Sequence, residues 1–444
     1  MSAGGERMNR RMAILLCLAG LLGLVPGGGR AAEVGMARIM AATDLHYLSP
    51  SLYQGSDVFL AALRRGDGKL TQHSDVLLQA LLDEARHQQP DALILTGDLT
   101  FNGEKQSHLE LAAALRAFTE ETGIPVRVIP GNHDILIADA HAFFQGGWAG
   151  TATITEAEFG EIYAGLMGAT PDAGYSTVLK ATERAWVALL DVGVYTEDAS
   201  IPFGVCREAH NRFLQQTLAE AEEAGALVVT CTHQNLLDQT SFNPESFGVW
   251  YPGVLHQLLR ESPASARLNL SGHIHAQHIV TQDGLTDAAT GALSVSPHLY
   301  AMVTVDPDGE VTYSAQPLCD AHLPEGFQAM SRQWFRSITI DKDRPQTAAF
   351  GVSAEEEEKL LAFAGDFNAA FFAGTLREER EALMASPGYA AWKRLTEVAA
   401  FARYMDQLMD EAEQDCRYWE NGPSQSPAVT APPEGEPRPS SVSP

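Results

Sequence analysis

The sequence has few cysteines and few basic residues, and it contains no long apolar run. Five cysteines occur in 444 residues and none forms a CxxC pair, so a zinc site built from thiolates is not expected. Lys and Arg number 30 against 57 Asp and Glu, a formal charge of −27. Such a charge repels nucleic-acid backbones and anionic lipid surfaces, which argues against binding of polynucleotide tracts as the main function. The apolar run Met12–Val25 is shorter than the roughly 20 residues that a membrane-spanning helix needs.

The N-terminus has the pattern of a secretory signal peptide. Three arginines, Arg7, Arg10 and Arg11, precede the apolar run, and Gly29-Arg30-Ala31 forms a small-x-small cleavage site. We therefore expect residues 1–31 to be removed, leaving an exported protein in the extracellular space or cell envelope with no stable membrane span. An uncleaved anchor is the alternative. Export permits disulfides, but the four remaining cysteines allow three pairings, and the sequence does not choose between them.

Short apolar runs alternate with amphipathic segments between about residues 36 and 275, which is typical of an α/β fold with buried strands. The expected strands are Ala37–Thr43, Ala92–Thr96, Val126–Ile129, Trp186–Leu190, Ala226–Thr232 and Leu268–Leu270. The expected helices are Ser74–Gln88, Gln106–Glu121, Glu208–Ala224 and Val254–Arg260. An Asp-Pro-Asp-Gly turn at 306–309 between two alternating segments predicts a hairpin at the edge of a sheet.

After about residue 320 the sequence pattern changes to one typical of helices. Helical periodicity covers Phe327–Ile338, Ala354–Phe372, Leu376–Met384 and Ala390–Arg417. The stretch that follows is rich in Pro, Ser, Gly and Glu and is expected to be disordered. We therefore divide the chain into a signal peptide (1–31), an α/β domain (32–320), a helical bundle (321–420) and a disordered tail (421–444).

Polar side chains with metal-binding chemistry follow five of the expected strands. The motifs are Asp-x-His, Gly-Asp, Gly-Asn-His-Asp, a single His, and Gly-His-x-His. Because loops after parallel strands converge at the carboxyl edge of an open sheet, these side chains should meet. They are Asp44, His46, Asp98, Asn132, His133, Asp134, His233, His273 and His275.

The donor set indicates two divalent transition metals. Imidazoles combined with carboxylates and an amide oxygen suit Mn, Fe, Zn, Co or Ni and are too nitrogen-rich for calcium. Seven ligands exceed the needs of one ion but suit two ions that share a carboxylate. Asp98 stands alone after its strand and is the natural bridge. If the Asp-x-His and His-x-His segments are extended, their alternate residues face the same side. Glycines at 97, 131 and 272 would let the backbone turn closely beneath the ions.

The ordered motifs resemble those of the calcineurin-like metallophosphoesterase superfamily, over residues 36–275. That resemblance implies a four-layer sandwich of two sheets flanked by helices, here followed by the helical bundle. It also implies a first metal on Asp44, His46 and His275, a second on Asn132, His233 and His273, and Asp98 as the bridge. By the same resemblance His133 is not a ligand: it protonates the leaving oxygen while a metal-bridging hydroxide attacks phosphorus.

Within the superfamily, this chain resembles secreted class III cyclic-nucleotide phosphodiesterase-like members. The resemblance lies in the sequences of the motifs, the predicted signal peptide and the helical C-terminal unit. Phe101 replaces the tyrosine that purple acid phosphatases need three residues after the bridging aspartate. Ser/Thr protein phosphatases carry an acidic residue and an arginine just after the bridging aspartate. The corresponding segment here, Leu99-Thr100-Phe101-Asn102, has neither. The resemblance thus implies a phosphodiesterase for cyclic nucleotides or other small nucleotide diesters, using two divalent ions, Mn or Fe first and Zn, Co or Ni as options. The alternatives are a phosphomonoesterase or 5′-nucleotidase at the same site and, remotely, a noncatalytic metal-stabilised binding module.

Residues beside the motifs have supporting roles. Tyr47 and Phe101 adjoin the ligand loops and could stack on a base, although packing is the commoner role for such aromatics. Asn102 and Glu104 are expected to cap a helix that begins near Lys105. Asp134 either orients neighbouring groups or serves a turn.

Overall fold

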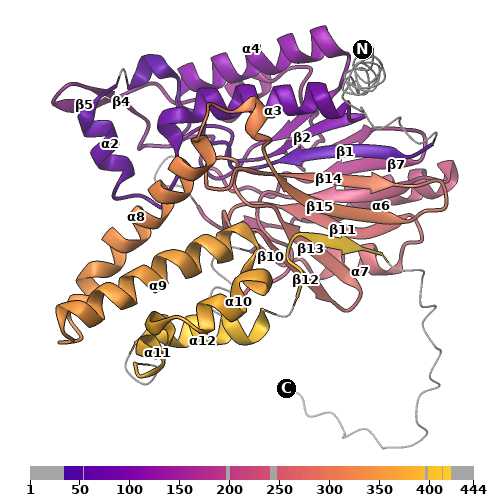
Figure 1. Cartoon of the computed structure of the whole chain (residues 1–444). Helices are drawn as coiled ribbons and strands as arrows, with labels where there is room; N and C mark the ends of the chain where they lie inside the picture. The colour runs from indigo at the N-terminus through magenta and orange to yellow at the C-terminus, as the bar shows by residue number, and fades with distance from the viewer. Residues whose placement is uncertain are drawn as a thin grey trace, which may run out of the picture.

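The computed structural model describes residues 35–53, 55–196, 201–240, 248–395, 399–412 and 414–421 (Figure 1). The predicted signal peptide and residues 422–444 of the predicted tail lie outside the described residues. None of the helices within the described ranges has the length and apolarity needed to span a membrane.

The first sheet has six strands in the order β16-β15-β14-β1-β2-β3. Strands β1, β2 and β3 are parallel and form one half of the sheet up to its edge at β3, while β14, β15 and β16 extend it in antiparallel fashion. The bounds are Ala37–Ala42 (β1), Ala92–Thr96 (β2), Val126–Ile129 (β3), Leu299–Val305 (β14), Val311–Pro317 (β15) and Tyr418–Glu420 (β16). The predicted hairpin is β14–β15, but its expected place at the sheet edge is wrong because β16 returns from the C-terminal region to cover β15.

The second sheet also has six strands, in the order β12-β13-β11-β9-β7-β6. Strands β7, β9, β11 and β13 are parallel, with an antiparallel strand at each edge. The bounds are Thr177–Lys180 (β6), Ala185–Leu189 (β7), Leu227–Cys231 (β9), Ser265–Ser271 (β11), His278–Gln282 (β12) and Leu285–Ala289 (β13).

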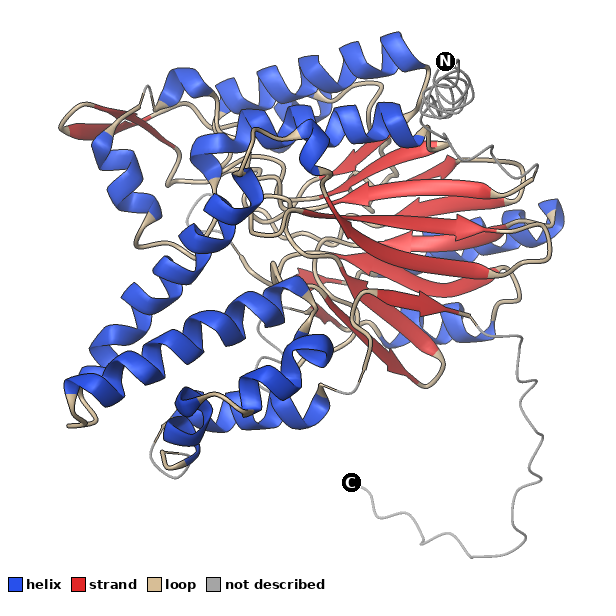
Figure 2. Ribbon diagram, in the orientation of Figure 1, coloured by secondary structure: helices blue, strands red, loops and turns tan. Residues whose placement is uncertain are grey.

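The two sheets face each other across an apolar core, and helices cover their outer faces (Figure 2). Ile39 and Ile94 from the first sheet pack with Val187, Val229 and Leu268 from the second. Helices α3 (Ser74–Gln88) and α4 (Lys105–Thr122) cover the first sheet, and α6 (Glu208–Ala224) and α7 (Gly253–Glu261) cover the second. The predicted four-layer sandwich is therefore confirmed.

Beyond the sheets, the C-terminal region is helical as predicted. It contains α8 (Phe327–Ala348), α9 (Ala354–Ala373), α10 (Leu376–Met384), α11 (Pro387–Lys393) and α12 (Ala400–Glu411). Helices α9–α12 share an apolar core, whereas Phe327 and Phe335 of α8 pack with residues of the α/β domain. Ser353 caps α9 by accepting the Glu356 N–H, and acidic residues occupy the first turn, where they suit the helix dipole. The prediction of continuous helical character over Ala390–Arg417 is wrong at its end, because the chain leaves α12 and pairs with β15.

Short elements complete the fold near the carboxyl edges of the sheets. Helix α2 (Asp57–Leu63) lies beside a hairpin formed by β4 (His141–Phe144) and β5 (Gly147–Gly150). Helix α5 (Glu156–Ile162) follows the hairpin, and β8 (Gly204–Val205) pairs with β10 (Val249–Trp250). The four cysteines from Cys206 onward are all free thiols.

Candidate metal centre

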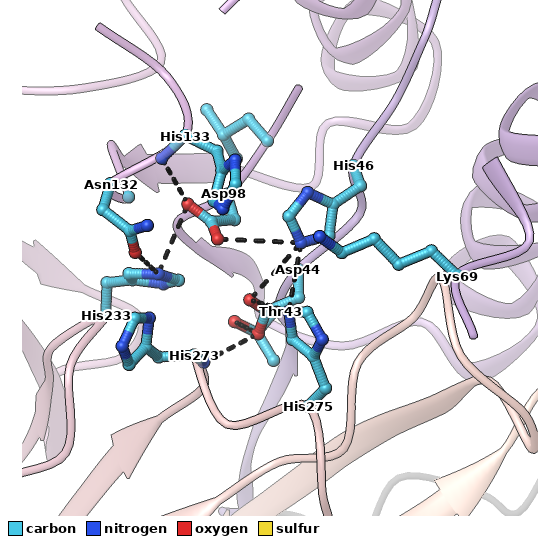
Figure 3. Close-up of polar contacts among 12 residues, drawn as sticks. Thr43, Asp44, His46, Lys69, Asp98, Asn132, His133, His233, His273 and His275 are labelled. Carbon is cyan, nitrogen blue, oxygen red and sulfur yellow. Dashed lines mark hydrogen bonds and ion pairs between the residues drawn. The ribbon is translucent and has the colours of Figure 1, made fainter. Parts of the chain in front are cut away.

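The loops that follow β1, β2, β3, β9 and β11 converge at one place between the two sheets (Figure 3). Backbone hydrogen bonds connect neighbouring loops beyond the strand ends. Asp44 N donates to Gly97 O at 3.1 Å, His46 N to Asp98 O at 3.0 Å, and Gly272 N to His233 O at 3.0 Å. The sheet pairing thus continues into the loops and fixes the side chains they carry.

Five of the predicted ligands have left-handed backbone conformations. The φ angles are 52° at Asp44, 44° at His46, 46° at Asp98, 70° at His273 and 60° at His275. The expectation that Asp-x-His and His-x-His are extended is therefore wrong, although both members of each pair do face the site. Each such conformation costs roughly 1–3 kcal/mol outside glycine, and strain of this kind concentrates at functional sites.

Two glycines allow the loops to approach one another closely, as expected. A Cβ at Gly131 would overlap the backbone nitrogen and a carboxylate oxygen of Asp98. A Cβ at Gly272 would overlap the hydroxyl of Thr43 and a carboxylate oxygen of Asp44. Any other residue at these positions would push the ligand loops apart.

The first cluster of metal-binding atoms consists of Asp44, His46, Asp98 and His275, all buried and within 4.8 Å of one another. The Nε2 atoms of His46 and His275 lie 3.1 Å apart. His275 Nε2 is 3.4 Å from Asp44 Oδ1, and His46 Nε2 is 3.6 Å from Asp98 Oδ2. Asp44 Oδ1 is buried without a hydrogen-bond partner among the described residues. Convergent imidazole nitrogens around an unsatisfied carboxylate oxygen fit a divalent cation.

The second cluster consists of Asp98, His233 and His273, again within 4.8 Å. His233 Nε2 lies 3.4 Å from Asp98 Oδ1 and 3.1 Å from Asn132 Oδ1, which brings the amide oxygen to the same place. Asp98 belongs to both clusters and turns one carboxylate oxygen toward each. The residues present therefore fit two divalent ions that share Asp98.

Surrounding groups orient the candidate ligands. Asp44 Oδ2 accepts hydrogen bonds from the Thr43 hydroxyl at 2.7 Å and the His273 N–H at 2.9 Å, which leaves Oδ1 for the cluster. His233 Nδ1 donates to Thr96 O at 2.9 Å, so Nε2 is the atom presented to Asp98. Such contacts fix the tautomer and the orientation of a metal-binding histidine.

The buried acidic and basic side chains of the centre shift one another's pKa values. Burial acts to raise the pKa of Asp98, but the charges of His233 and His133 hold that pKa well below its usual range. Burial acts to lower the pKa of His233, but the charge and hydrogen bond of Asp98 raise it to about 9. Burial lowers the pKa of His273 to about 3. Because histidine binds metal as the neutral ring, a cation entering beside Asp98 would displace the proton from His233.

His133 lies at the centre but belongs to neither cluster. Its backbone N–H donates to Asp98 Oδ1 at 2.8 Å, and its ring lies edge-on to His46 with centroids 5.1 Å apart. Its Nδ1 lies 2.9 Å from Asn102 Oδ1, so the proton is assigned to Nδ1 and Nε2 is left for other contacts. The expectation that Asn102 and Glu104 cap α4 is wrong for both side chains: Glu104 occupies the N-cap position, but no side chain makes a cap hydrogen bond there.

Asp134 joins two of the ligand loops. Its carboxylate accepts the N–H groups of Leu99, Thr100 and Gly131 at 2.8–3.1 Å. Burial, followed by the charge of Asp98, raises the pKa of Asp134 to about 7. Of the two roles considered for this residue, the contacts favour orientation of the loops after β2 and β3. Tyr47 is buried and donates to Glu110 at 3.0 Å, which favours packing over base stacking.

Sequence reasoning missed a charged pair beside the first cluster. Lys69 is only 8% exposed, and its ammonium lies 3.2 Å from Asp67 Oδ2. The same oxygen lies 3.4 Å from His275 Nδ1, on the side of that ring away from the cluster. In Figure 3 the Lys69 side chain reaches toward His46. Both residues lie in a loop between helices, so a search restricted to strand ends could not find them.

We predict that Lys69→Met lowers kcat/KM for a phosphoester by about 10- to 100-fold, because a buried positive charge near the reacting phosphate is lost. Steady-state kinetics at constant metal content measure this effect. Lys359→Met is the control, since Lys359 forms only an exposed pair with Glu355 on α9. Unchanged kcat/KM in the Lys69 variant would show that its ammonium serves only to hold Asp67.

Sequence comparison identifies the class of protein that carries this centre. Residues 37–277 match the model of the calcineurin-like phosphoesterases, so the chain belongs to this family. Residues 320–415 match the model described as the C-terminal domain of cyclic nucleotide phosphodiesterase. With its buried His/Asp metal site, the chain is a metal-dependent phosphoesterase, as the motifs predicted. No curated protein sequence matches it.

Solved structures share parts of the fold at low sequence identity. A dimetal phosphatase from Danio rerio is 12% identical, with a TM-score of 0.49, and the match covers 64% of this chain and 97% of that one. GAP50, the anchor in the inner membrane complex of Plasmodium, is 12% identical, with a TM-score of 0.38 and coverage of 68% and 95%. A Staphylococcus aureus protein whose structure is described as that of a 5′-nucleotidase is 14% identical, with a TM-score of 0.39. The match covers 67% of this chain and 58% of that one. The family assignment rests on the sequence match, since these scores are below 0.5.

Proposed function

We propose that the protein hydrolyses phosphodiesters, with cyclic nucleotides or other small nucleotide diesters as substrates. The observation that carries this proposal is the match of residues 320–415 to the C-terminal domain of cyclic nucleotide phosphodiesterase, in the same chain as the His/Asp centre. Two bound divalent ions would supply water activation and charge neutralisation at the phosphate. This explains how a protein with a formal charge of −27 can attract an anionic substrate locally.

The side chains of the centre would divide the work as follows. Asp44, His46 and His275 would hold one ion, Asn132, His233 and His273 the other, and Asp98 both. His133 would orient the phosphate and, in its doubly protonated form, give its Nε2 proton to the leaving oxygen, because Asn102 holds the other proton on Nδ1. Asp134 would hold Asp98 and Asn132 in position, because its carboxylate accepts the N–H groups of the adjacent residues Leu99 and Gly131.

The nature of the ions and the location of the protein are parts of the same proposal. The nitrogen-rich donor set supports manganese or iron, with zinc, cobalt or nickel as further options. The N-terminal arginines and apolar run support export to the extracellular space or the cell envelope. N-terminal sequencing of the protein recovered from its native compartment tests the predicted cleavage after Ala31.

We expect the manganese-loaded protein to hydrolyse bis-p-nitrophenyl phosphate faster than p-nitrophenyl phosphate, and to lose this activity on chelation. The physical reason is that the ions provide the large stabilising terms that phosphoester hydrolysis requires. The assay compares kcat/KM for the two esters, before and after EDTA, and then for 2′,3′- and 3′,5′-cyclic nucleotides.

Two results would contradict this expectation in different ways. A rate for the monoester well above that for the diester would favour the phosphomonoesterase or 5′-nucleotidase alternative at the same metals. Absence of turnover for every ester despite two bound ions would favour a binding module over an enzyme.

A further inference from the structure

The hairpin β4–β5 lies beside α2 (Figure 1). It begins only a few residues after His133, and the Ser56 hydroxyl, which precedes α2, donates to Phe144 O at 2.9 Å. Because α2 and the loop that carries His133 are each connected to this hairpin, its position relative to the centre is fixed.

Aromatic rings form a continuous series from the loop of the bridging aspartate to this hairpin. Phe101 lies edge-on to Phe59 with centroids 6.1 Å apart, and Phe59 packs on Phe143 at 4.9 Å. At the far end of the series His141 lies edge-on to Trp148 at 4.4 Å. Trp148 is 59% exposed, so its ring is free to contact a ligand.

Except for the buried Phe59, these rings line a cavity of about 700 Å³, hereafter the aromatic pocket. Its walls include Phe101, Phe143 and Trp148, and its charged residues are Arg65, Lys69 and Lys342 against Asp67 and Asp139. Positive charge therefore prevails locally in a protein with a large acidic excess. The size is that of a typical small-molecule site.

The aromatic pocket is joined to the metal centre by two of its own wall residues. Asn102 contacts the His133 ring at 2.9 Å, and Asp67 contacts His275 at 3.4 Å. The cavity therefore adjoins the side of the centre that carries His133 and His275. The cavity lined by Trp250, Tyr251 and His256, about 490 Å³, has no Lys or Arg among its described lining residues. It is thus less suited to an anion.

We propose that the aromatic pocket binds the nucleoside part of the substrate, with the base stacked on Trp148 and the pocket cations beside the phosphate. This proposal rests on the nucleotide substrate proposed above. In this arrangement, substrate specificity comes from the pocket between α2 and the hairpin. Base stacking on an aromatic ring tolerates different bases, so the pocket should favour nucleotides over simple phosphoesters more than one base over another.

The test is equilibrium binding of AMP and of ribose 5-phosphate to the manganese-loaded full chain, measured by titration calorimetry. Trp148→Ala should weaken AMP binding by about 5- to 100-fold, because one base–ring stack is lost. It should change ribose 5-phosphate binding by about twofold at most, and Trp148→Phe should keep most of the AMP affinity. Because Trp148 is exposed, both variants should fold as the parent does, and circular dichroism checks this.

The control is Tyr251→Ala, which removes another exposed aromatic ring, 76% exposed, from the rival cavity. Unchanged AMP affinity in Trp148→Ala, or an equal loss in Tyr251→Ala, would overturn the proposed pocket. AMP has no diester bond, so its binding does not depend on diester hydrolysis and the two proposals fail separately. Intact AMP binding in a protein that hydrolyses no diester would overturn the proposed function and leave the pocket standing.

Discussion

His133→Ala is expected to lower the turnover of a nucleotide diester by about 10²- to 10⁴-fold while both metal ions stay bound. The ring lies outside both ligand clusters, so its removal takes away a proton donor and leaves every predicted ligand in place. Single-turnover kinetics and elemental analysis of the purified variant measure the two effects separately. The backbone hydrogen bond from His133 to Asp98 survives the substitution because it uses the main-chain N–H.

The leaving group provides a sharper readout for the same variant. An alkoxide leaving from a nucleotide diester needs a proton, whereas p-nitrophenolate is a good leaving group without one. His133→Ala should therefore impair the nucleotide diester far more than bis-p-nitrophenyl phosphate. Equal losses on both substrates, or loss of metal, would contradict the role of proton donor. His87→Ala is the control, since His87 is exposed on α3.

Asp98→Asn is expected to weaken both metal sites together, by more than about 100-fold each, and to reduce turnover by at least 10³-fold. The reason is geometric: Asp98 Oδ2 lies toward His46 in one cluster, and Oδ1 lies toward His233 in the other. Asparagine keeps the shape but lacks the negative charge and one acceptor oxygen. Metal titration with two resolved binding events, followed by elemental analysis, tests this expectation.

Asp191→Asn is a matched control for the Asp98 variant. Asp191 is also a buried carboxylate just beyond a strand, but it accepts hydrogen bonds from Tyr175 N–H and the Tyr195 hydroxyl and belongs to neither cluster. Any loss of stability from removing a buried charge should appear in both variants, while loss of metal should appear only in Asp98→Asn. Release of one ion alone would show that Asp98 does not bridge.

The layered fold and the gathering of the ligands could be predicted because both follow from local sequence patterns. Strands β2 and β3 and helices α3, α6 and α10 have the predicted bounds, since each is a compact apolar or amphipathic segment with clear ends. A polar residue directly after a buried strand must emerge at the sheet edge, and this rule found Asp44, Asp98 and His233.

What the patterns missed depends on contacts between distant segments or on backbone conformation. The left-handed turns at His46 and His275 arise from pairing between loops, which no local periodicity encodes. Lys69 is carried by an irregular loop and reaches the site through its long side chain, and the turn of Asn102 toward His133 depends on a partner 31 positions away. Strand β16 is three residues long and forms only because β15 offers an open edge.

That last strand changes how the helical region is joined to the rest of the molecule. Thr312 pairs with Glu420 and Ser314 with Tyr418, so the chain that departs after β15 comes back to the neighbouring position in the same sheet. In topological terms helices α8–α12 are an insertion at the tip of a β-hairpin, tethered at entry and exit. The helical region therefore cannot swing away from the sheet about a single linker. A variant in which a short turn joins β15 directly to β16 would lack the helices and keep every strand of the sheet.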